Sequence, residues 1–336
     1  MNMFLLASCS LALTAQSPEP SAEAVDMSPA AEAITQLMQT HHYDPAELEA
    51  PAYRAIEASV LELGETAPDR DSFLAGFRTL WADGPFSHVN LTEAQGPAAD
   101  MAAFVDSMNV GGGGATLSWD GDIAILNVTT MMGQDTIAEI NAAYAEIASR
   151  SADALIIDLR ENGGGAFAVL PLVRHVLTEP LNAGVFVSQP WNEANDRAPT
   201  AADLEDAAPW EGWSLRSFWA AVQTNTLTPI SFDPPVENRF DGPVYVLTSS
   251  QTASAAEMAA DALSASGRAV LIGERTAGEM LSQTVFDVPG GLQLWLPVAD
   301  YYSLANGRIE GQGVTPAIPA DASDAMNIAL ELIASH

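Results

Sequence analysis

Ser254 is the residue whose surroundings most clearly allow chemistry, and it lies in the segment 248–257, which reads TSSQTASAAE. An apolar run ends at this segment and a helical pattern begins at Ala255; ligand sites in α/β sheets form at such strand ends. A hydroxyl at a helix N-terminus suits nucleophilic attack, because the free N–H groups and the helix dipole stabilise developing negative charge. The alternative is structural, since Ser254 and Glu257 have the spacing of a capping box.

A glycine-rich turn is the second feature that could take part in chemistry. Residues 154–165 read ALIIDLRENGGG, an apolar strand that runs into three consecutive glycines. Such glycines let the backbone approach a ligand closely and direct N–H groups at it. The turn is not a phosphate-binding Walker loop, because the Gly-Lys-Ser/Thr ending is absent. The structural alternative is a tight turn in which Asp158 and Arg160 form an ion pair.

These two segments, in this order and about ninety residues apart, resemble the core of the S41 peptidases. That family contains the C-terminal processing (tail-specific) proteases and the tricorn core. Two downstream stretches match the same pattern, namely 268–278 (RAVLIGERTAG) and 310–316 (EGQGVTP). The resemblance covers about residues 121–318 and implies a crotonase- or ClpP-like α/β core.

The resemblance also implies roles for individual residues. The serine nucleophile of the family corresponds to Ser254. The oxyanion hole corresponds to an amide of the glycine turn, Gly163 or Gly164, together with the amide of Ala255. A hole of this kind stabilises the negative charge that develops during acyl transfer.

Which residue acts as general base differs between branches of the family. Members with a processing-protease site use lysine, but this sequence contains no lysine, because all 12 of its basic residues are arginine. The tricorn-like and retinoid-binding-protein-like branches instead carry a histidine before the core, and the pair Ser87-His88 fits that place. By the same resemblance Glu310 completes a Ser-His-Ser-Glu tetrad, acting on Ser87 or on the histidine. The structural alternatives are that His88 is a surface histidine and that Glu310 is an exposed acid after a turn.

The remaining histidines and the single cysteine indicate no other centre. His41 and His42 stand at an expected helix end and are typical of capping, whereas His175 lies in an apolar helical context typical of packing. His336 is the last residue, and Cys9 is the only cysteine. Since no His/Cys/Asp/Glu spacing is typical of a zinc or calcium site, the sequence predicts neither a metal nor a cofactor.

The charge of the chain excludes one class of partner. Its formal net charge of −32 reflects few cations as much as many anions. Such a chain repels phosphate backbones and anionic membrane surfaces, so nucleic-acid binding is not expected. We interpret the acidic residues as a solvated surface.

The N-terminal residues 1–25 are expected to be an export signal or lipoprotein leader. Residues 5–9 (LLASC) resemble a lipobox, in which Cys9 becomes the lipidated first residue of the mature protein. The alternative is ordinary secretory cleavage after Ala15. Residues 1–8 contain no Lys or Arg and are short for a signal peptide. Both interpretations predict an exported protein of the periplasm or cell envelope, with a lipid anchor at Cys9 in the first.

The rest of the sequence predicts an α/β protein in two parts. Helical periodicity predicts a small N-terminal helical domain over 26–95, too small to be stable alone and therefore docked on the core. Strands alternating with helices predict a largely parallel αβ core over 96–336. About 25 residues separate Leu91 from Ala115, too few for the PDZ domain of many S41 members. The insertion 186–233 carries four tryptophans and is expected to be a lid or, alternatively, a packed surface excursion.

We therefore predict an exported serine peptidase that acts on peptides or polypeptides, with Ser254 as nucleophile and His88 as base. The alternative from another class is a catalytically silent binding module of the same fold, holding an apolar ligand or a peptide. A third interpretation is a crotonase-fold enzyme that acts on a thioester with the oxyanion hole but without Ser254. The sequence assigns no oligomeric state.

Overall fold

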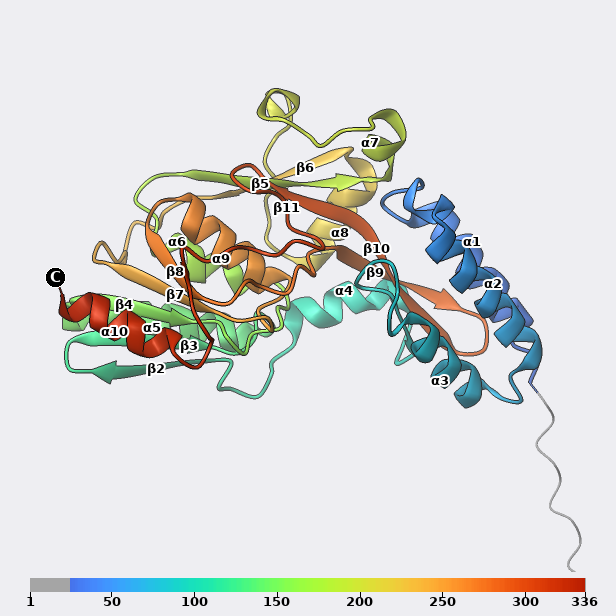
Figure 1. Ribbon diagram of the computed structural model, residues 1–336, viewed down its shortest axis with the longest axis horizontal. Helices are drawn as coiled ribbons and strands as arrows, with labels where there is room; N and C mark the ends of the chain where they lie inside the picture. The colour runs from blue at the N-terminus through green and yellow to red at the C-terminus, as the bar shows by residue number, and fades with distance from the viewer. Residues whose placement is uncertain (1–24, 336) are drawn as a thin grey trace, which may run out of the picture.

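The computed structural model describes residues 25–335 and contains two six-stranded sheets with helices between and around them (Figure 1). Helices α6 (Val169–Arg174) and α9 (Ala255–Ala265) lie between the sheets. Helix α9 contacts a strand of each sheet. Since all residues of α9 from 255 to 263 are buried, this layer is the centre of the main hydrophobic core.

The first sheet is the parallel one that the sequence predicts. Its order is β12-β8-β7-β4-β3-β2, and only β2 runs antiparallel to its neighbour. The central strands are buried on both faces and for that reason read as continuous apolar runs. The strands are β2 (Ala115–Asp120), β3 (Ile123–Val128), β4 (Ala154–Asp158), β7 (Val244–Thr248), β8 (Ala269–Gly273) and β12 (Ile318–Pro319).

The second sheet is antiparallel and is organised around one long strand, β10. This strand pairs with β9 along one edge and with β1 and then β5 along the other, and β6 extends the sheet beyond β5. The strands are β1 (Asn90–Glu93), β5 (Leu181–Ser188), β6 (Leu227–Phe232), β9 (Ser282–Val288), β10 (Leu292–Ser303) and β11 (Gly307–Arg308). The β9–β10 hairpin turns at Pro289-Gly290-Gly291.

Two further helices cover the parallel sheet on opposite faces. Helix α10 (Ala325–Ala334) packs on one face through a small cluster that includes Ile156 and Tyr245. Helix α5 (Gln134–Arg150) packs on the other face beside α6, and its Tyr144 hydroxyl donates to the carbonyl of Leu172. The result is a stack of four layers, helix, sheet, helices and sheet.

The N-terminal helices form one end of the molecule, at the right of Figure 1. They pack on the β9–β10 hairpin, and Phe73 and Phe77 share one buried cluster with Leu292 and Leu294. Residues 90–93, inside the predicted helical domain, form β1 of the core sheet instead. The helical elements are α1 (Ser28–His41), the 3-10 turn η1 (Glu47–Glu49), α2 (Pro51–Thr66) and α3 (Arg70–Trp81).

A partly buried charge network also attaches this helical end to the core. Arg308 donates to Asp300 Oδ2 at 2.6 Å, to the Tyr43 hydroxyl at 2.7 Å and to Glu47 Oε1 at 3.0 Å. Burial raises the pKa of Asp300 to about 7, and the charge of Arg308 opposes that rise. Because the network joins η1 and the loop before it to β10 and β11, it fixes this helical end next to the strand that leads to Glu310.

The insertion 186–233, called here the tryptophan-rich segment, packs as part of the core. It begins within β5 and ends just after β6, which pairs with β5, and three of its four tryptophans, Trp191, Trp210 and Trp219, are only 8% exposed. Asp106 accepts the N–H groups of Leu215 and Arg216 and thereby caps α8. The segment contains α7 (Gln189–Ala194), the 3-10 turn η2 (Ala201–Leu204) and α8 (Leu215–Thr224).

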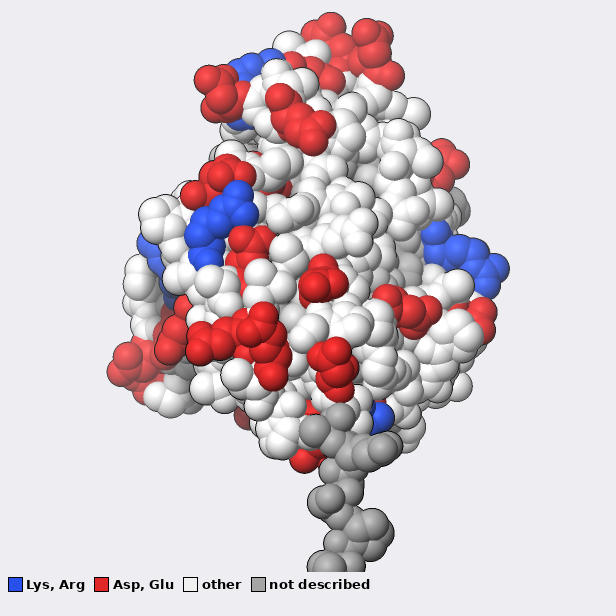
Figure 2. All heavy atoms as spheres, turned by 90° about the vertical axis from the view of Figure 1, so that its right-hand side faces the viewer, with Lys and Arg blue, Asp and Glu red and all other residues white. Residues whose placement is uncertain are grey.

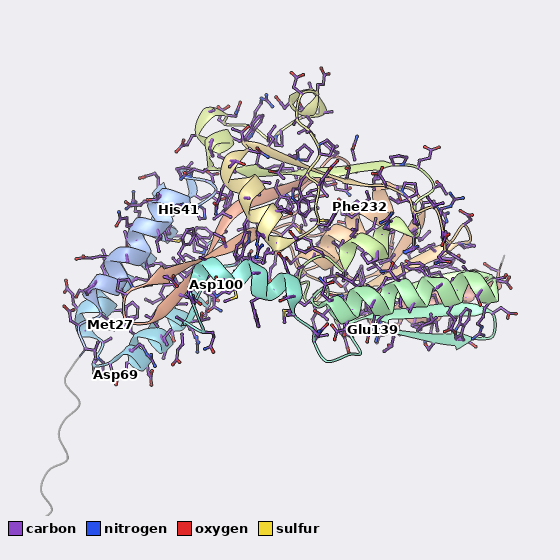
Figure 3. All side chains as sticks on the ribbon, turned by 180° about the vertical axis from the view of Figure 1, so that it is seen from behind. Met27, His41, Asp69, Asp100, Glu139 and Phe232 are labelled. Carbon is purple, nitrogen blue, oxygen red and sulfur yellow. The ribbon has the colours of Figure 1, made fainter. Side chains whose placement is uncertain are left out.

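Helix α4 (Ala98–Ser107) bridges the helical end and the core, and the sequence did not predict it. Figure 3 shows it between the helices that begin just after Met27 and Asp69 and the helix that carries Glu139. The glycine run 111–114, which reads as flexible, is held by carboxylates: Asp135 accepts three main-chain N–H groups there and Glu139 accepts two.

The surface agrees with the acidic composition. On the face that carries the N-terminal helices, acidic groups far outnumber basic ones (Figure 2). Within residues 25–335, every helix is too short or too polar to span a bilayer. The predicted leader and Cys9 lie outside the described residues.

Candidate active site

The predicted nucleophile occupies a sharp strand-to-helix turn. Ser254 follows β7 and precedes the first residue of α9, with a φ of 54° and a ψ of −122°. A non-glycine residue with positive φ is strained and persists only where its surroundings hold it. Here the Ser254 N–H donates to the carbonyl of Glu279 at 3.0 Å and to Glu257 Oε2 at 3.1 Å. The strained turn is therefore anchored at its amide.

Glu257 is the side chain that ties this turn to the rest of the site. It is fully buried, and its carboxylate accepts the amide of Ser254, the Thr276 hydroxyl at 2.6 Å and the amides of Gly278 and Glu279 at 2.8 Å each. Burial raises the pKa of Glu257, and these donors oppose the rise. Local spacing indicates only a capping residue at this position, because the contacts of Glu257 with residues 276–279 join parts of the chain about 20 residues apart.

The glycine turn lies directly against the nucleophile. Buried Asn162 donates from Nδ2 to the carbonyl of Val128 at 3.0 Å and accepts the Gly164 N–H on Oδ1 at 2.8 Å, while its own carbonyl accepts the Ala253 N–H. A Cβ on Gly164 would lie 2.7 Å from the Cβ of Ser254, so only glycine fits. Asn162 is a positioning residue that the sequence analysis left without a role.

Two main-chain amides remain available beside Ser254. The N–H of Gly164 is engaged by Asn162, whereas those of Gly163 and Ala255 donate to no acceptor among residues 25–335. Ala255 is the first residue of α9, where N–H groups have no partner within the helix. These two amides could therefore bind an oxyanion.

The loop between α3 and β1 brings the predicted base to the same place. His88 has a φ of 62°, and its Nδ1 lies 2.5 Å from the Ser87 hydroxyl oxygen. The nearby Phe86 packs in a tilted arrangement against His42 of the N-terminal helical end, with ring centroids 4.3 Å apart, and against Trp81 at 5.3 Å. The helical end therefore holds the loop that carries His88.

Glu310 approaches this loop from the other end of the sequence. Its Oε1 accepts the main-chain N–H of Ser87 at 3.3 Å, and its Oε2 accepts the N–H groups of Met280 at 2.6 Å and Leu281 at 3.2 Å. The carboxylate is 8% exposed. It thus contacts the backbone of Ser87, one of the two targets that the sequence analysis left open.

The electrostatic setting favours a neutral histidine. Burial lowers the pKa of His88, and the nearby charges of Glu310 and Glu279 oppose that change. A histidine with a lowered pKa is neutral near pH 7 and can accept a proton. With Nδ1 engaged by Ser87, Nε2 is the nitrogen that remains for the nucleophile.

Ser254 and His88 line one cavity of about 470 Å³, together with Gly163, Gly164 and Ala255. In the part of the chain that the structure describes, no hydrogen bond joins the His88 ring to Ser254. Catalytic hydrogen bonds are often long without substrate and tighten in the Michaelis complex, so shared placement in one cavity is compatible with proton transfer.

The histidines for which the sequence indicates a structural role have hydrogen-bond partners. His42 is buried, with Nδ1 2.9 Å from the carbonyl oxygen of Asp44, and the His175 ring lies between Asn238 and Asn141. Across residues 25–335, no cluster of three His, Cys, Asp or Glu side chains could hold a metal ion.

A sequence model of peptidase family S41 matches residues 122–320, more than half of the chain. The chain belongs to peptidase family S41. The resemblance read from residues 121–318 is thereby confirmed, and the match includes the glycine turn, Ser254 and Glu310, although His88 precedes it.

Curated relatives of this S41 chain are C-terminal processing enzymes. It is 29% identical over 178 residues to the carboxyl-terminal-processing protease of Picosynechococcus sp., which covers 53% of this chain and 34% of that protein. It is 29% identical over 187 residues to the chloroplastic C-terminal processing peptidase of Tetradesmus obliquus, covering 56% and 33%. The chain thus matches about a third of the length of these relatives.

Solved structures share the S41 fold along nearly the whole chain. A photosystem II D1 C-terminal processing protease superposes with a TM-score of 0.54 at 18% identity and covers 89% of this chain and 94% of that one. A lipoprotein from Streptococcus agalactiae superposes with a TM-score of 0.59 at 14% identity, covering 96% and 99%. The prediction of an α/β core with N-terminal helices is confirmed.

Proposed function

We propose that the chain is a serine peptidase of the Ser-His-Ser-Glu type, with Ser254 as nucleophile and His88 as base. The observation that carries this proposal is the convergence of a strained serine at a helix N-terminus, a half-buried histidine and two unengaged amides on one cavity. Ser87 orients the ring, and Glu310 orients Ser87. With no lysine in the sequence, a Ser-Lys mechanism has no base.

The chemistry follows from this arrangement. His88 Nδ1–H donates to the Ser87 oxygen, which leaves Nε2 to take the proton of Ser254 as its oxygen attacks the substrate carbonyl carbon. The amides of Gly163 and Ala255 hold the carbonyl oxygen as it becomes negative. The imidazolium then gives its proton to the departing amine, and an acyl-enzyme remains. Water hydrolyses that ester with His88 again acting as base.

Export belongs to the same proposal. We infer that residues 1–25 direct the chain to the periplasm or cell envelope, with Cys9 as a lipid anchor. The lipobox-like residues 5–9 support this inference, and the structurally similar Streptococcus agalactiae protein is itself described as a lipoprotein.

One observation favours a second function, a catalytically silent binding module. The cavity at Ser254 is walled by aromatic side chains, as would suit an apolar ligand. The arrangement of Ser87, His88 and the two amides around Ser254 has no evident use in such a module, so we rank it second.

A fluorophosphonate probe distinguishes the two functions. We expect stoichiometric labelling of the wild-type protein, with the adduct mapped to Ser254 by peptide mass spectrometry and lost in Ser254→Ala. The matched control is Ser250→Ala, which removes an exposed serine from the same segment. An unlabelled Ser254 in folded protein would reject the peptidase and leave the binding module.

The pH profile tests the role of His88. Because burial lowers its pKa, activity should persist to lower pH than with an ordinary histidine base and fall only when His88 becomes protonated. The exposed Glu279 favours the protonated ring, so Glu279→Gln should move the acidic limb of kcat/KM further toward low pH. Glu331→Gln, on α10, is the matched control. An unmoved limb, or one moved toward high pH, would contradict this assignment.

A further inference from the structure

The tryptophan-rich segment supplies a wall of the cavity that contains Ser254. Its contribution is almost wholly apolar and aromatic, and it comes from Trp210, Trp213, Leu215, Phe218 and Trp219. Phe167, just after the glycine turn, and Met258, one helical turn after Ser254, continue the apolar lining and lie within a few residues of the two free amides in the sequence.

The aromatic rings pack against one another, so the shape of the cavity wall is fixed. Ring centroids are 5.0 Å apart for Trp210 and Trp213, 5.3 Å for Trp210 and Phe218, and 5.7 Å for Phe167 and Trp210. Trp213 also packs 5.0 Å from Phe232 of β6. Such mutually packed rings form a preorganised surface that needs little ordering when a ligand binds.

Trp213 has the backbone geometry of a residue that is held in place. Its φ is 37°, and the preceding Gly212 has a φ of 101°. A bulky residue with positive φ is a conformational outlier that the surrounding structure must impose. Trp213 is also only partly buried, so its ring is accessible at the cavity wall.

The cavity is uncharged in a strongly acidic protein. Apart from His88, every described residue that lines it is apolar or carries a neutral polar group, such as Ser282 and Gln283. Moving a charged side chain into such a site without a partner is costly, whereas an apolar side chain gains from burial. At about 470 Å³ the cavity has room for an aromatic side chain and its adjoining main chain.

We propose that this cavity is the specificity pocket for the residue that supplies the acyl group, and that it selects a large apolar side chain, aromatic or long aliphatic. Trp213 is the main specificity-determining residue. The proposal rests on the peptidase function above: with the carbonyl oxygen on Gly163 and Ala255, the side chain next to the carbonyl carbon enters the space beside Phe167 and Met258. The segment expected to be a lid thus serves as the wall of the pocket.

Internally quenched peptides that differ at one position test the proposal. With Phe, Leu, Ala or Asp on the acyl side of the cut, located by mass spectrometry, kcat/KM should be about 100-fold higher for Phe and Leu than for Ala. The Asp peptide should not be cleaved. In Trp213→Ala the Phe-to-Ala ratio should fall at least tenfold, while Trp119→Ala, which changes a partly buried tryptophan outside the cavity, should keep it.

A binding measurement separates this proposal from the peptidase function. In the Ser254→Ala protein, N-acetylphenylalaninamide should change tryptophan fluorescence at concentrations at least tenfold below N-acetylalaninamide, and Trp213→Ala should abolish the difference. Cleavage without preference, or with preference only on the amine side of the cut, would overturn the pocket and leave the peptidase. Selective binding in a protein that neither cleaves peptides nor reacts with the fluorophosphonate would reject the peptidase but keep the apolar ligand class. Absence of both would reject both.

Discussion

Replacing His88 with alanine should lower kcat/KM about 10⁴- to 10⁶-fold while the protein stays folded. The reason is that Ser254 then has no group to take its proton, since the sequence has no lysine and the other histidines of the described chain have their own structural partners. The loss should appear both in peptide hydrolysis and in the rate of fluorophosphonate labelling, with circular dichroism as the check on folding.

Companion variants sharpen this test. The double variant Ser254→Ala/His88→Ala should be no slower than the worse single variant, because the two residues act as a unit. His175→Gln is the matched control, since His175 is buried away from the cavity. A loss of less than tenfold in His88→Ala would show that another group is the base.

Replacing Glu257 with glutamine should destabilise the protein by about 3 kcal/mol and also lower kcat. The carboxylate accepts four hydrogen bonds, two on each oxygen, and every one comes from an N–H or O–H donor. Glutamine has one acceptor oxygen, and its NH₂ group would face two of these donors. Ser254 would then lose a contact that holds its strained φ.

Thermal and denaturant unfolding measure the first effect, and kcat at a temperature where the variant is folded measures the second. The control is Glu237→Gln, an exposed carboxylate for which a change within about 0.5 kcal/mol is expected. Stability of Glu257→Gln within that same margin would contradict the role assigned to the buried carboxylate.

The two buried glutamates act on the same piece of chain. Within residues 278–281, the first two amides donate to Glu257 and the last two donate to Glu310. Through this segment the turn that carries Ser254 is connected to the backbone of Ser87 and so to His88. The position of His88 relative to Ser254 therefore depends on both carboxylates, although neither contacts the other.

The parts of the fold that local pattern encodes were predictable from the sequence. The strand 154–158, the turn after it and the helix that begins at Ala255 follow from apolar runs, glycines and a capping pattern, all of which act over a few residues. The S41 resemblance rests on these local units in order. For that reason the sequence alone sufficed for the α/β class and for the family, and it made Ser254 the candidate nucleophile.

Contacts between residues far apart in the chain were decided only by the tertiary structure. Glu310 meets Ser87 across 223 positions, and no spacing rule carries that information. The sequence showed the tryptophans of 186–233 but not that the segment would begin and end in paired strands, because antiparallel pairing of β5 and β6 is settled by burial against α6 and α9. That packing turns an expected lid into the wall of the cavity at Ser254. Local propensity determined the elements, and long-range burial and hydrogen bonding determined the site.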